Sequence, residues 1–246
     1  MTKKPNITIF FPVYNDEHTV RRVAEKSLDV LSQVADHYEV IIINDGSPDR
    51  SGEVADEVAA ENPKVKVIHH EVNRGYGAAV KTGLAAAQYE WICFTDGDDE
   101  YDVYELKKMI PLLAFYQLII TFRYKRLYSS KRIFISKVYN WVFRMLYNTP
   151  YRDISTGFRV INKQLAESIE ISSDSPFIGA EITLKSMLKG YPVGEVGIQT
   201  FPREFGQGAS VKFKNIMRTI QDMFRIRREV FSRSYDLPDN RERINS

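Results

Sequence analysis

An acidic cluster directly after a short apolar run is the part of the chain best suited to chemistry. Residues 91–95 have the composition of a buried strand, and Asp96, Gly97, Asp98 and Glu100 follow them. Mg²⁺ and Mn²⁺ prefer carboxylate oxygen and usually bind through one or two protein carboxylates together with substrate phosphates. The cluster therefore indicates a divalent-metal and diphosphate site. The alternative interpretation is a solvated acidic loop after a strand.

Two further polar turns follow apolar runs earlier in the chain. Residues 12–16 end the first run, and residues 44–47 follow the second. Tyr14 could stack on a nucleoside base, and Asp45 could accept hydrogen bonds from a base or a ribose. The alternatives are an ordinary strand-to-helix turn, in which Asp16 favours the helix N-terminus, and an Asx-type turn.

Alternating strand and helix patterns in the first half of the chain must position these turns. The order βαβαβαβ predicts an α/β fold of doubly wound type with a parallel sheet. Because ligands bind at the carboxyl ends of the strands in open α/β sheets, we expect the three turns to converge at one edge. The predicted strands lie at 7–13, 39–43, 64–70 and 91–95, and the predicted helices at 17–34, 51–61 and 75–88.

The second half is less regular, but it shows no internal repeat and no linker, so we expect one domain over residues 1–231. Residues 211–231 predict a C-terminal amphipathic helix, and residues 232–246 form a polar tail that we expect to be frayed. The other predicted helices lie at 103–113, 131–147 and 180–188, and the other predicted strands at 117–122, 157–161 and 193–200.

Basic residues are unevenly placed along the chain. The formal net charge is +2, yet the stretch 106–152 holds ten Lys or Arg and no Asp or Glu. This asymmetry suits a phosphate-rich ligand or an anionic membrane surface. Guanidinium groups bind phosphate bidentately, although most arginines are plain surface residues. The candidates for phosphate contacts are Arg123, Arg132, Arg152, Arg159 and Arg203.

The amino-acid composition indicates the broad class of protein. The 246 residues are 43% hydrophobic and 27% charged, which is ordinary for a globular protein. The single cysteine, Cys93, excludes an intrachain disulfide and fits a reducing compartment. The longest apolar stretch, at 109–122, contains Pro111 and Gln117 and is too short to span a bilayer.

In combination, these motifs resemble the family 2 glycosyltransferases of GT-A fold. Within that family the polyprenyl-phosphate glycosyltransferases, the dolichyl-phosphate mannose synthase-like subgroup, are the most similar. The resemblance extends over residues 7–228. The segments that carry it are Pro12–Asp16, Asn44–Ser47, Asn73–Gly77, Asp96–Glu100, Thr121–Arg123, Asp153–Phe158 and, imperfectly, Arg203–Gly208.

The resemblance implies a role for each matching residue. The metal ligands would be Asp98 and Glu100. Asp96 and Gly97 would lie on the donor side, where Asp96 would contact the ribose or the metal shell. The residues taking part in catalysis would be Asp98, Asp153, Arg123 and Arg203. The nucleoside would be held by Pro12, Tyr14, Asn15, Asp16 and Asp45, and the phosphates of donor and acceptor by Arg123, Arg132 and Arg203.

Four positions depart from the family pattern. Asp16 replaces Glu and Asn44 replaces Asp, which affects the base contacts. Glu100 replaces Gln, and its added negative charge should tighten metal binding. Gly208 stands where Ser is expected in the acceptor loop.

The resemblance also implies a mechanism. A divalent metal, Mg²⁺ or Mn²⁺, and arginines would neutralise the leaving diphosphate. A hydroxyl acceptor would need a general base, for which Asp153 is the candidate. A lipid phosphate would not, because its second pKa is about 6; Asp153 would then orient the acceptor-site arginines. The expected reaction is inverting transfer of a hexose from a UDP- or GDP-sugar to a polyprenyl phosphate.

Several alternatives stay open. The acceptor could instead be a saccharide or protein hydroxyl, or the chain could be a non-catalytic nucleotide-sugar-binding subunit. The helix at 211–231 could pack on the sheet or lie in a membrane interface. We expect a cytoplasmic, peripheral location at the membrane face, with either a separate membrane subunit or a homo-oligomer as partner and no nucleic acid. The base, the sugar and the choice of metal are left open.

Overall fold

The computed structural model describes residues 3–125, 130–154, 156–202, 204–205 and 213–232. Within these residues, seven strands form one sheet in the order β3-β2-β1-β4-β6-β5-β7. The pairs β1–β2, β1–β4, β2–β3 and β5–β7 are parallel, and β6 is antiparallel to β4 and β5. The strands are β1 (Ile7–Val13), β2 (Tyr38–Asn44), β3 (Val65–His69), β4 (Trp91–Phe94), β5 (Leu118–Lys125), β6 (Arg159–Asn162) and β7 (Val193–Gln199).

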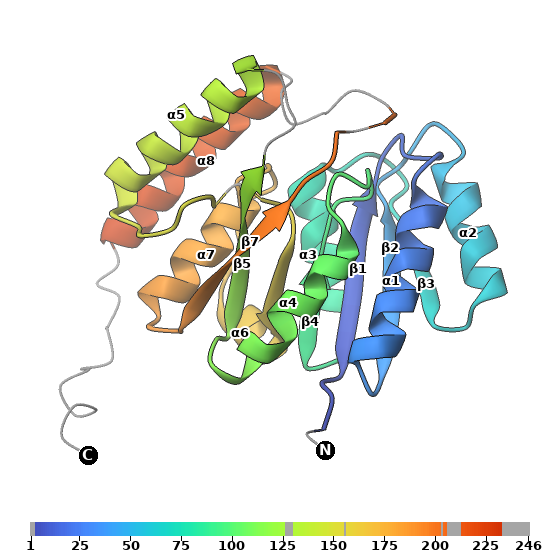
Figure 1. The fold of residues 1–246 in the computed structure, drawn as a ribbon. Helices are drawn as coiled ribbons and strands as arrows, with labels where there is room; N and C mark the ends of the chain where they lie inside the picture. The colour runs from blue at the N-terminus through green and yellow to red at the C-terminus, as the bar shows by residue number, and fades with distance from the viewer. Residues whose placement is uncertain (1–2, 126–129, 155, 203, 206–212, 233–246) are drawn as a thin grey trace.

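Helices cover both faces of the sheet (Figure 1). Side chains alternate along the strands, so that Ile9 and Phe11 pack into the core under α1, α2 and α4, whereas Phe10 packs into the core on the side of α3 and α7. The helices are α1 (Val20–Val34), α2 (Ser51–Glu61), α3 (Tyr76–Ala86), α4 (Leu106–Met109), α5 (Ser130–Tyr147), α6 (Lys163–Ser168), α7 (Ile178–Leu188) and α8 (Phe213–Ser232), with 3₁₀ turns η1 (Val103–Glu105) and η2 (Ile110–Ala114).

The predicted α/β class, the mostly parallel sheet and the C-terminal helix are confirmed. The single helix predicted at 103–113 is wrong: the segment is η1, α4 and η2 in succession, and Pro111, which has no N–H to donate, stands at the start of η2. The helix expected from residue 17 begins at Val20, because the carbonyl of Asp16 first closes a turn with the amide of Thr19. Helix α6 was not predicted.

Helices α5 and α8 lie side by side near the carboxyl ends of β5 and β7 (Figure 1). The hydroxyl of Tyr147 in α5 donates to the carbonyl of Met223 in α8. Lys185 Nζ of α7 lies 3.1 Å from Glu229 Oε1 of α8, and this ion pair attaches the C-terminal helix to the core. Among the described helices, none combines the length and apolar character needed to cross a membrane. The predicted tail falls outside the described residues, apart from Ser232 at the end of α8.

Candidate functional site

The turns after β1, β2 and β4 meet at the carboxyl edge of the sheet, as the sequence predicts. A Cβ atom at Gly97 would lie 2.7 Å from the carbonyl oxygen of Pro12, so the acidic loop touches the end of β1. The amide of Asp45 donates to the carbonyl of Val13 at 3.1 Å. The hydroxyl of Thr19 donates to the carbonyl of Gly97 at 2.7 Å, which fastens the acidic loop to the start of α1.

The three acidic residues Asp98, Asp99 and Glu100 have different environments within the loop. Asp98 and Glu100 are both buried, and the Glu100 amide donates to Asp98 Oδ1 at 3.1 Å. Asp99 has a φ of 57°, in the left-handed region. Its carboxylate turns to α1, where Oδ2 lies 2.7 Å from Arg22 Nε and 2.9 Å from Lys26 Nζ. Asp99 therefore holds the loop in place.

Asp96 is held between two other segments. The hydroxyl of Tyr76, the first residue of α3, donates to Asp96 Oδ1 at 2.9 Å. A Cβ atom at Gly157 would lie 2.5 Å from Asp96 Oδ2 and 2.6 Å from Oδ1, so the backbone of the loop before β6 packs against the carboxylate. The Gly157 amide donates to the hydroxyl of Tyr101 at 3.1 Å. The Asp96 carboxylate is thus positioned by α3 and by the loop before β6.

The described part of the chain contains no group of three or more His, Cys, Asp or Glu side chains arranged to hold a metal ion. Asp96, Asp98 and Glu100 therefore do not form a closed three-carboxylate cage. A closed cage is not what Mg²⁺ requires, since that ion is commonly bound by one or two carboxylates plus substrate phosphates. The loop offers only oxygen donors, which fit a hard cation.

Asp45 lies at the predicted edge, but its buried carboxylate is engaged within the chain. It lies 2.7 Å from Nδ1 of the buried His70 and accepts hydrogen bonds from the amides of Arg74 and Gly75, each at 2.9 Å. The other ring nitrogen of His70 lies 2.9 Å from Thr82 Oγ1. Asp45 thus shapes the loop that leads into α3, and its effect on a ligand is expected to pass through this loop.

The turn after β1 is closed by one of its own side chains. Asp16 closes the turn, because its Oδ2 accepts the Tyr14 amide at 3.0 Å while its own amide donates to Ser51 Oγ at 2.9 Å. Asn15 has a φ of 61°. This backbone leaves the ring of Tyr14 38% exposed at the edge, where an aromatic face suits a base.

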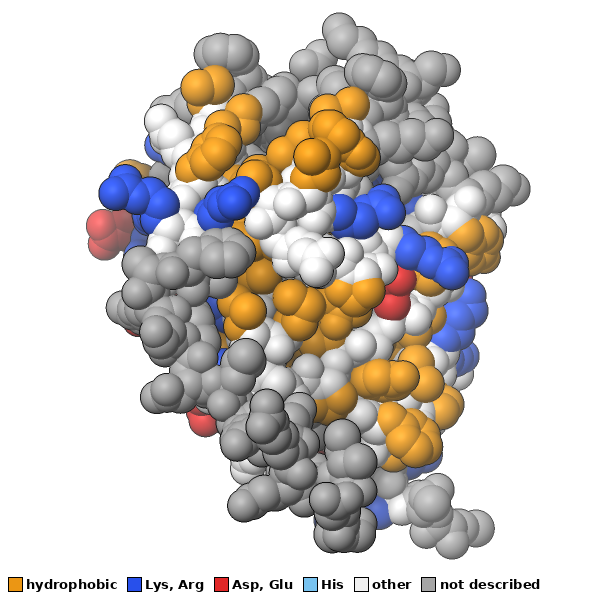
Figure 2. Space-filling view, turned by 90° about the vertical axis from the view of Figure 1, so that its left-hand side faces the viewer, with side chains coloured by type: hydrophobic (Ala, Val, Ile, Leu, Met, Phe, Trp, Pro, Cys, Tyr) orange, Lys and Arg blue, Asp and Glu red, His pale blue; other side chains and the backbone are white. Residues whose placement is uncertain are grey.

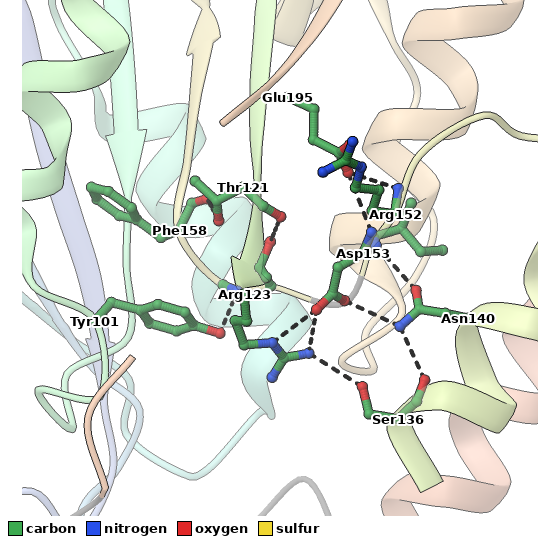
Figure 3. A network of polar contacts seen from close by, with 12 residues as sticks. Tyr101, Thr121, Arg123, Ser136, Asn140, Arg152, Asp153, Phe158 and Glu195 are labelled. Carbon is green, nitrogen blue, oxygen red and sulfur yellow. Dashed lines mark hydrogen bonds and ion pairs between the residues drawn. The ribbon is translucent and has the colours of Figure 1, made fainter. Parts of the chain in front are cut away.

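A second polar network joins β5, α5, β7 and the loop before β6 (Figure 3). Arg123 Nε and Nη2 each lie 2.8 Å from Asp153 Oδ2, and Asp153 is 1% exposed. Asn140 of α5 donates to Asp153 Oδ1 at 3.2 Å. Glu195 of β7 accepts the amides of Arg152 and Asp153 at 2.8 and 3.3 Å. Burial raises the pKa of Glu195 above its ordinary value.

The candidate arginines have different environments. Arg159 is 0% exposed, and its guanidinium donates to the carbonyls of Thr156 and Gly179 and to Thr183 Oγ1. The suggestion that Arg159 contacts phosphate is therefore wrong: it links the loop before β6 to α7, and burial lowers its pKa. Arg152 is exposed and stacks over the Phe122 ring at 4.7 Å. The side chain of Arg132, and all of Arg203, lie outside the described residues.

Sequence reasoning did not identify Tyr76, Asn140 or Glu195 as parts of the site. The segment Gly75-Tyr76-Gly77 forms the start of α3, with Gly75 at its N-cap. In the structure the Gly77 amide already donates to the carbonyl of Asp174 at 3.1 Å, so the useful group there is the tyrosine hydroxyl. Asn140 and Glu195 carry no local motif, because they meet Asp153 only through the tertiary fold.

Comparison with known proteins identifies the family and the fold. The family model described as glycosyl transferase family 2 matches residues 8–169. The chain is 28% identical over 211 residues to the polyprenol monophosphomannose synthase of Mycolicibacterium smegmatis, covering 80% of this chain and 78% of that protein. It is 26% identical over 221 residues to the undecaprenyl-phosphate 4-deoxy-4-formamido-L-arabinose transferase of Pectobacterium carotovorum, covering 86% of this chain and 65% of that protein. With two other relatives the match spans only 26% and 33% of their length.

Solved structures show the same fold. Glucosyl-3-phosphoglycerate synthase from Mycobacterium tuberculosis, in complex with Mn²⁺, UDP and phosphoglyceric acid, matches with a TM-score of 0.71 at 16% identity, over 96% of this chain and 80% of that chain. The same enzyme in complex with Mg²⁺ and UDP matches with a TM-score of 0.67. The likeness confirms the expected GT-A-type fold.

Proposed function

Because the chain belongs to glycosyl transferase family 2, we propose that it transfers a hexose, with inversion and with a divalent metal, from a UDP- or GDP-sugar to a polyprenyl phosphate. The names of two relatives support a polyprenyl-phosphate acceptor. The Mn²⁺, Mg²⁺ and UDP in the matching structures support the donor and the metal. On this proposal residues 1–231 form the catalytic domain, which works at the cytoplasmic face of a membrane.

The donor half lies at the edge formed by the turns after β1 and β4. The exposed ring of Tyr14 stacks on the base, and Asp96 contacts the ribose or the metal shell. A bound divalent ion would neutralise charge on the leaving diphosphate, and Asp98 and Glu100 are the side chains that would hold it. The remaining donor contacts are assigned to Pro12, Asn15, Asp16 and Gly97, while Asp45 acts through the loop before α3.

The acceptor half is built around Arg123, and its contact with Asp153 is the observation that favours a phosphate acceptor. Both guanidinium contacts at 2.8 Å go to one carboxylate oxygen, and Asn140 donates to the other. A general base needs an oxygen that can reach the acceptor hydroxyl, whereas these oxygens serve to orient a cation. A lipid phosphate needs no base because it is already largely anionic. Arg132 and Arg203 are further proposed phosphate ligands.

The membrane contact is assigned to one face of α5 and α8, here called the α5–α8 face. Figure 2 shows hydrophobic side chains gathered on this side of the molecule with Lys and Arg between them. The spacing i, i+3, i+7 places each set of exposed side chains on one side of its helix. The apolar members are Val138, Trp141 and Met145 in α5 and Met217, Ile220 and Phe224 in α8. The exposed arginines of the same two helices are Arg144, Arg218, Arg225 and Arg228.

This composition fits an interfacial position. Apolar side chains enter the headgroup boundary while arginines bind anionic lipid, and an exposed tryptophan suits the same depth. Trp141, which is exposed, neighbours Asn140, which is buried against Asp153. The helix that contacts lipid on one side would therefore hold the acceptor-site ion pair on the other.

Ligand-induced stabilisation tests the donor half. Binding to the folded state alone raises stability by RT ln(1 + [L]/Kd), about 2.7 kcal/mol when the ligand is at 100 times its Kd. We expect a UDP- or GDP-sugar to raise the melting temperature only when Mn²⁺ or Mg²⁺ is present. No stabilisation by any nucleotide sugar with either metal would contradict the proposed donor.

A further inference from the structure

The carboxylate of Asp96 is fixed in orientation by groups outside the acidic loop. The torsion that turns a carboxylate about its Cβ–Cγ bond is broad and roughly two-fold, so an unrestrained aspartate samples many orientations. Here the Tyr76 hydroxyl donates to Oδ1 at 2.9 Å. The Gly157 backbone packs against the carboxylate group itself, since a Cβ atom there would lie 2.5 Å from Oδ2 and 2.6 Å from Oδ1. The two contacts select one orientation.

Tyr76 is itself held rigidly at the start of α3. The amides of Arg74 and Gly75, which precede it, both donate to the buried carboxylate of Asp45. Gly75 has a φ of 96°, a conformation that glycine adopts readily and other residues do not. After Tyr76, the Gly77 amide donates to the carbonyl of Asp174. The hydroxyl therefore approaches Asp96 from a backbone anchored to β2 and to the loop before α7.

Gly157 connects Asp96 to the acceptor side. It follows Asp153 by four positions in the loop before β6. Its amide donates to the Tyr101 hydroxyl at 3.1 Å, and Tyr101 pairs in an isolated bridge with Thr200, directly after β7. The contacts of Asp96 thus reach both halves of the site.

We propose that Tyr76 is a positioning residue for the sugar-nucleotide donor: its hydroxyl holds Asp96 in the orientation that binds the donor. The inference rests on the proposed function, because it takes Asp96 to be a donor contact. Tyr76 does not touch the reacting atoms. Loss of the hydroxyl releases the carboxylate, which lowers donor affinity and leaves the acceptor site unchanged.

A matched pair of substitutions tests the role. Tyr76→Phe removes the hydroxyl and retains the ring. Tyr104→Phe makes the same change where a tyrosine donates to an exposed carboxylate, Asp29 Oδ2, at 2.6 Å. A hydrogen bond to a charged group contributes about 1.5–3 kcal/mol, so we expect Tyr76→Phe to raise the Kd and KM for the donor about tenfold or more. The acceptor KM of Tyr76→Phe and the donor Kd of Tyr104→Phe should stay near their wild-type values.

A double-mutant cycle shows whether Tyr76 acts through Asp96. Calorimetric binding of UDP and of GDP with Mn²⁺ is measured for the wild type, Tyr76→Phe, Asp96→Asn and the double variant, so no acceptor is needed. If the tyrosine acts through the carboxylate, adding Tyr76→Phe to Asp96→Asn weakens binding no further. Additive losses, or wild-type affinity in Tyr76→Phe, would overturn the inference alone. A wild type that binds neither nucleotide would overturn the inference and the proposed donor together.

Discussion

Arg123 and Asp153 form a buried ion pair in which Nε and Nη2 of the arginine each lie 2.8 Å from the same carboxylate oxygen. The pair joins β5 to the loop before β6, and Asn140 adds α5 to it. It places a guanidinium at the sheet edge near the helices of the α5–α8 face. In the proposed function, this guanidinium contacts the acceptor phosphate.

Because Asp153 is engaged in this ion pair, we expect the effect of Asp153→Asn to differ between a phosphate acceptor and a hydroxyl acceptor. With a polyprenyl phosphate we expect a partial defect, seen as an acceptor KM raised about tenfold or more, because a lost hydrogen bond to a charged group costs about 1.5–3 kcal/mol. With a hydroxyl acceptor the loss should be nearly complete, because the base is removed. Initial-rate kinetics distinguish the two outcomes.

Removing one partner of a buried pair also lowers the free energy of unfolding, by about 3–5 kcal/mol. Melting temperatures must therefore accompany the kinetics, with the exposed Asp56→Asn, which loses only a surface contact to His69, as the control. Near-complete loss of transfer to polyprenyl phosphate by a folded Asp153→Asn variant would speak against the orienting role.

The acidic loop offers two neighbouring aspartates for a test of metal binding. We expect Asp98→Asn to lower transfer by at least about 100-fold, since a lost metal ligand removes several kcal/mol of charge stabilisation. It should also abolish the Mn²⁺-dependent stabilisation by the donor. Asp99→Asn is the control: asparagine tolerates the left-handed backbone, and the Asp99 side chain forms ion pairs with Arg22 and Lys26 of α1.

For the Asp99→Asn variant we expect some loss of stability but an unchanged metal requirement. For both variants, the stabilisation by the donor is measured while Mn²⁺ or Mg²⁺ is titrated. A metal dependence that persists in Asp98→Asn and disappears in Asp99→Asn would contradict the assignment of Asp98 as the metal ligand and of Asp99 as the residue that holds the loop.

The α5–α8 face predicts binding to anionic lipid. We expect Trp141→Ser combined with Phe224→Ser to reduce co-sedimentation with vesicles that contain phosphatidylglycerol, because both apolar groups leave the interface. Binding by the wild type should weaken with salt, since screening reduces the attraction of arginines to the lipid. Phe115→Ser, at a side chain 69% exposed beyond η2, is the matched control. Equal vesicle binding by all three proteins would exclude this face.

A buried charge network predicts a pH dependence of stability. Burial alone would raise the pKa of Glu181, but hydrogen bonds from Lys185 and from Ser172 and Ser173 outweigh it, so this pKa lies below its ordinary value of 4.5. A lowered carboxyl pKa contributes stability above the unfolded-state pKa, and this contribution is lost as the pH falls through the folded-state pKa. Wild-type stability should therefore decline as the pH falls below 4.5.

Lys185→Met leaves Glu181 buried without its cation. We expect a loss of about 3–5 kcal/mol in the free energy of unfolding at neutral pH. The difference should shrink in acid, where Glu181 is protonated. Urea unfolding across the pH range measures this, with the surface variant Lys163→Met as control, since Lys163 lies 3.9 Å from Glu167. A Lys185→Met variant as stable as wild type at neutral pH would exclude this role.

The sequence predicts much of the fold because the signals are local. Apolar runs bounded by turns mark β1 and β2 closely, and the alternation with helices implies the sheet edge where Asp45 and Asp96 lie. The antiparallel direction of β6 has no local signal, since it depends on pairing with β4 and β5. Helix α6 is only six residues long, too short for a periodic pattern to identify it.

The candidate site also contains features that local sequence signals do not predict. Residue type suggested a phosphate role for Arg159, but only the fold shows that its guanidinium is buried against backbone carbonyls. Asp45 has the expected type and place, yet His70 and two amides occupy its oxygens. Partners far apart in sequence, such as Tyr76 with Asp96, follow from tertiary packing and have no spacing rule.

Transfer of radiolabelled hexose to lipid tests the central claim most directly. The full chain is incubated with labelled UDP- and GDP-hexoses, Mn²⁺ or Mg²⁺, and polyprenyl phosphate in anionic vesicles, and the organic phase is then counted. We predict lipid-linked sugar with at least one donor, dependent on the divalent metal and lost in Asp98→Asn. No labelled lipid with any of these donors, together with labelled saccharide or protein when hydroxyl acceptors are supplied, would contradict it.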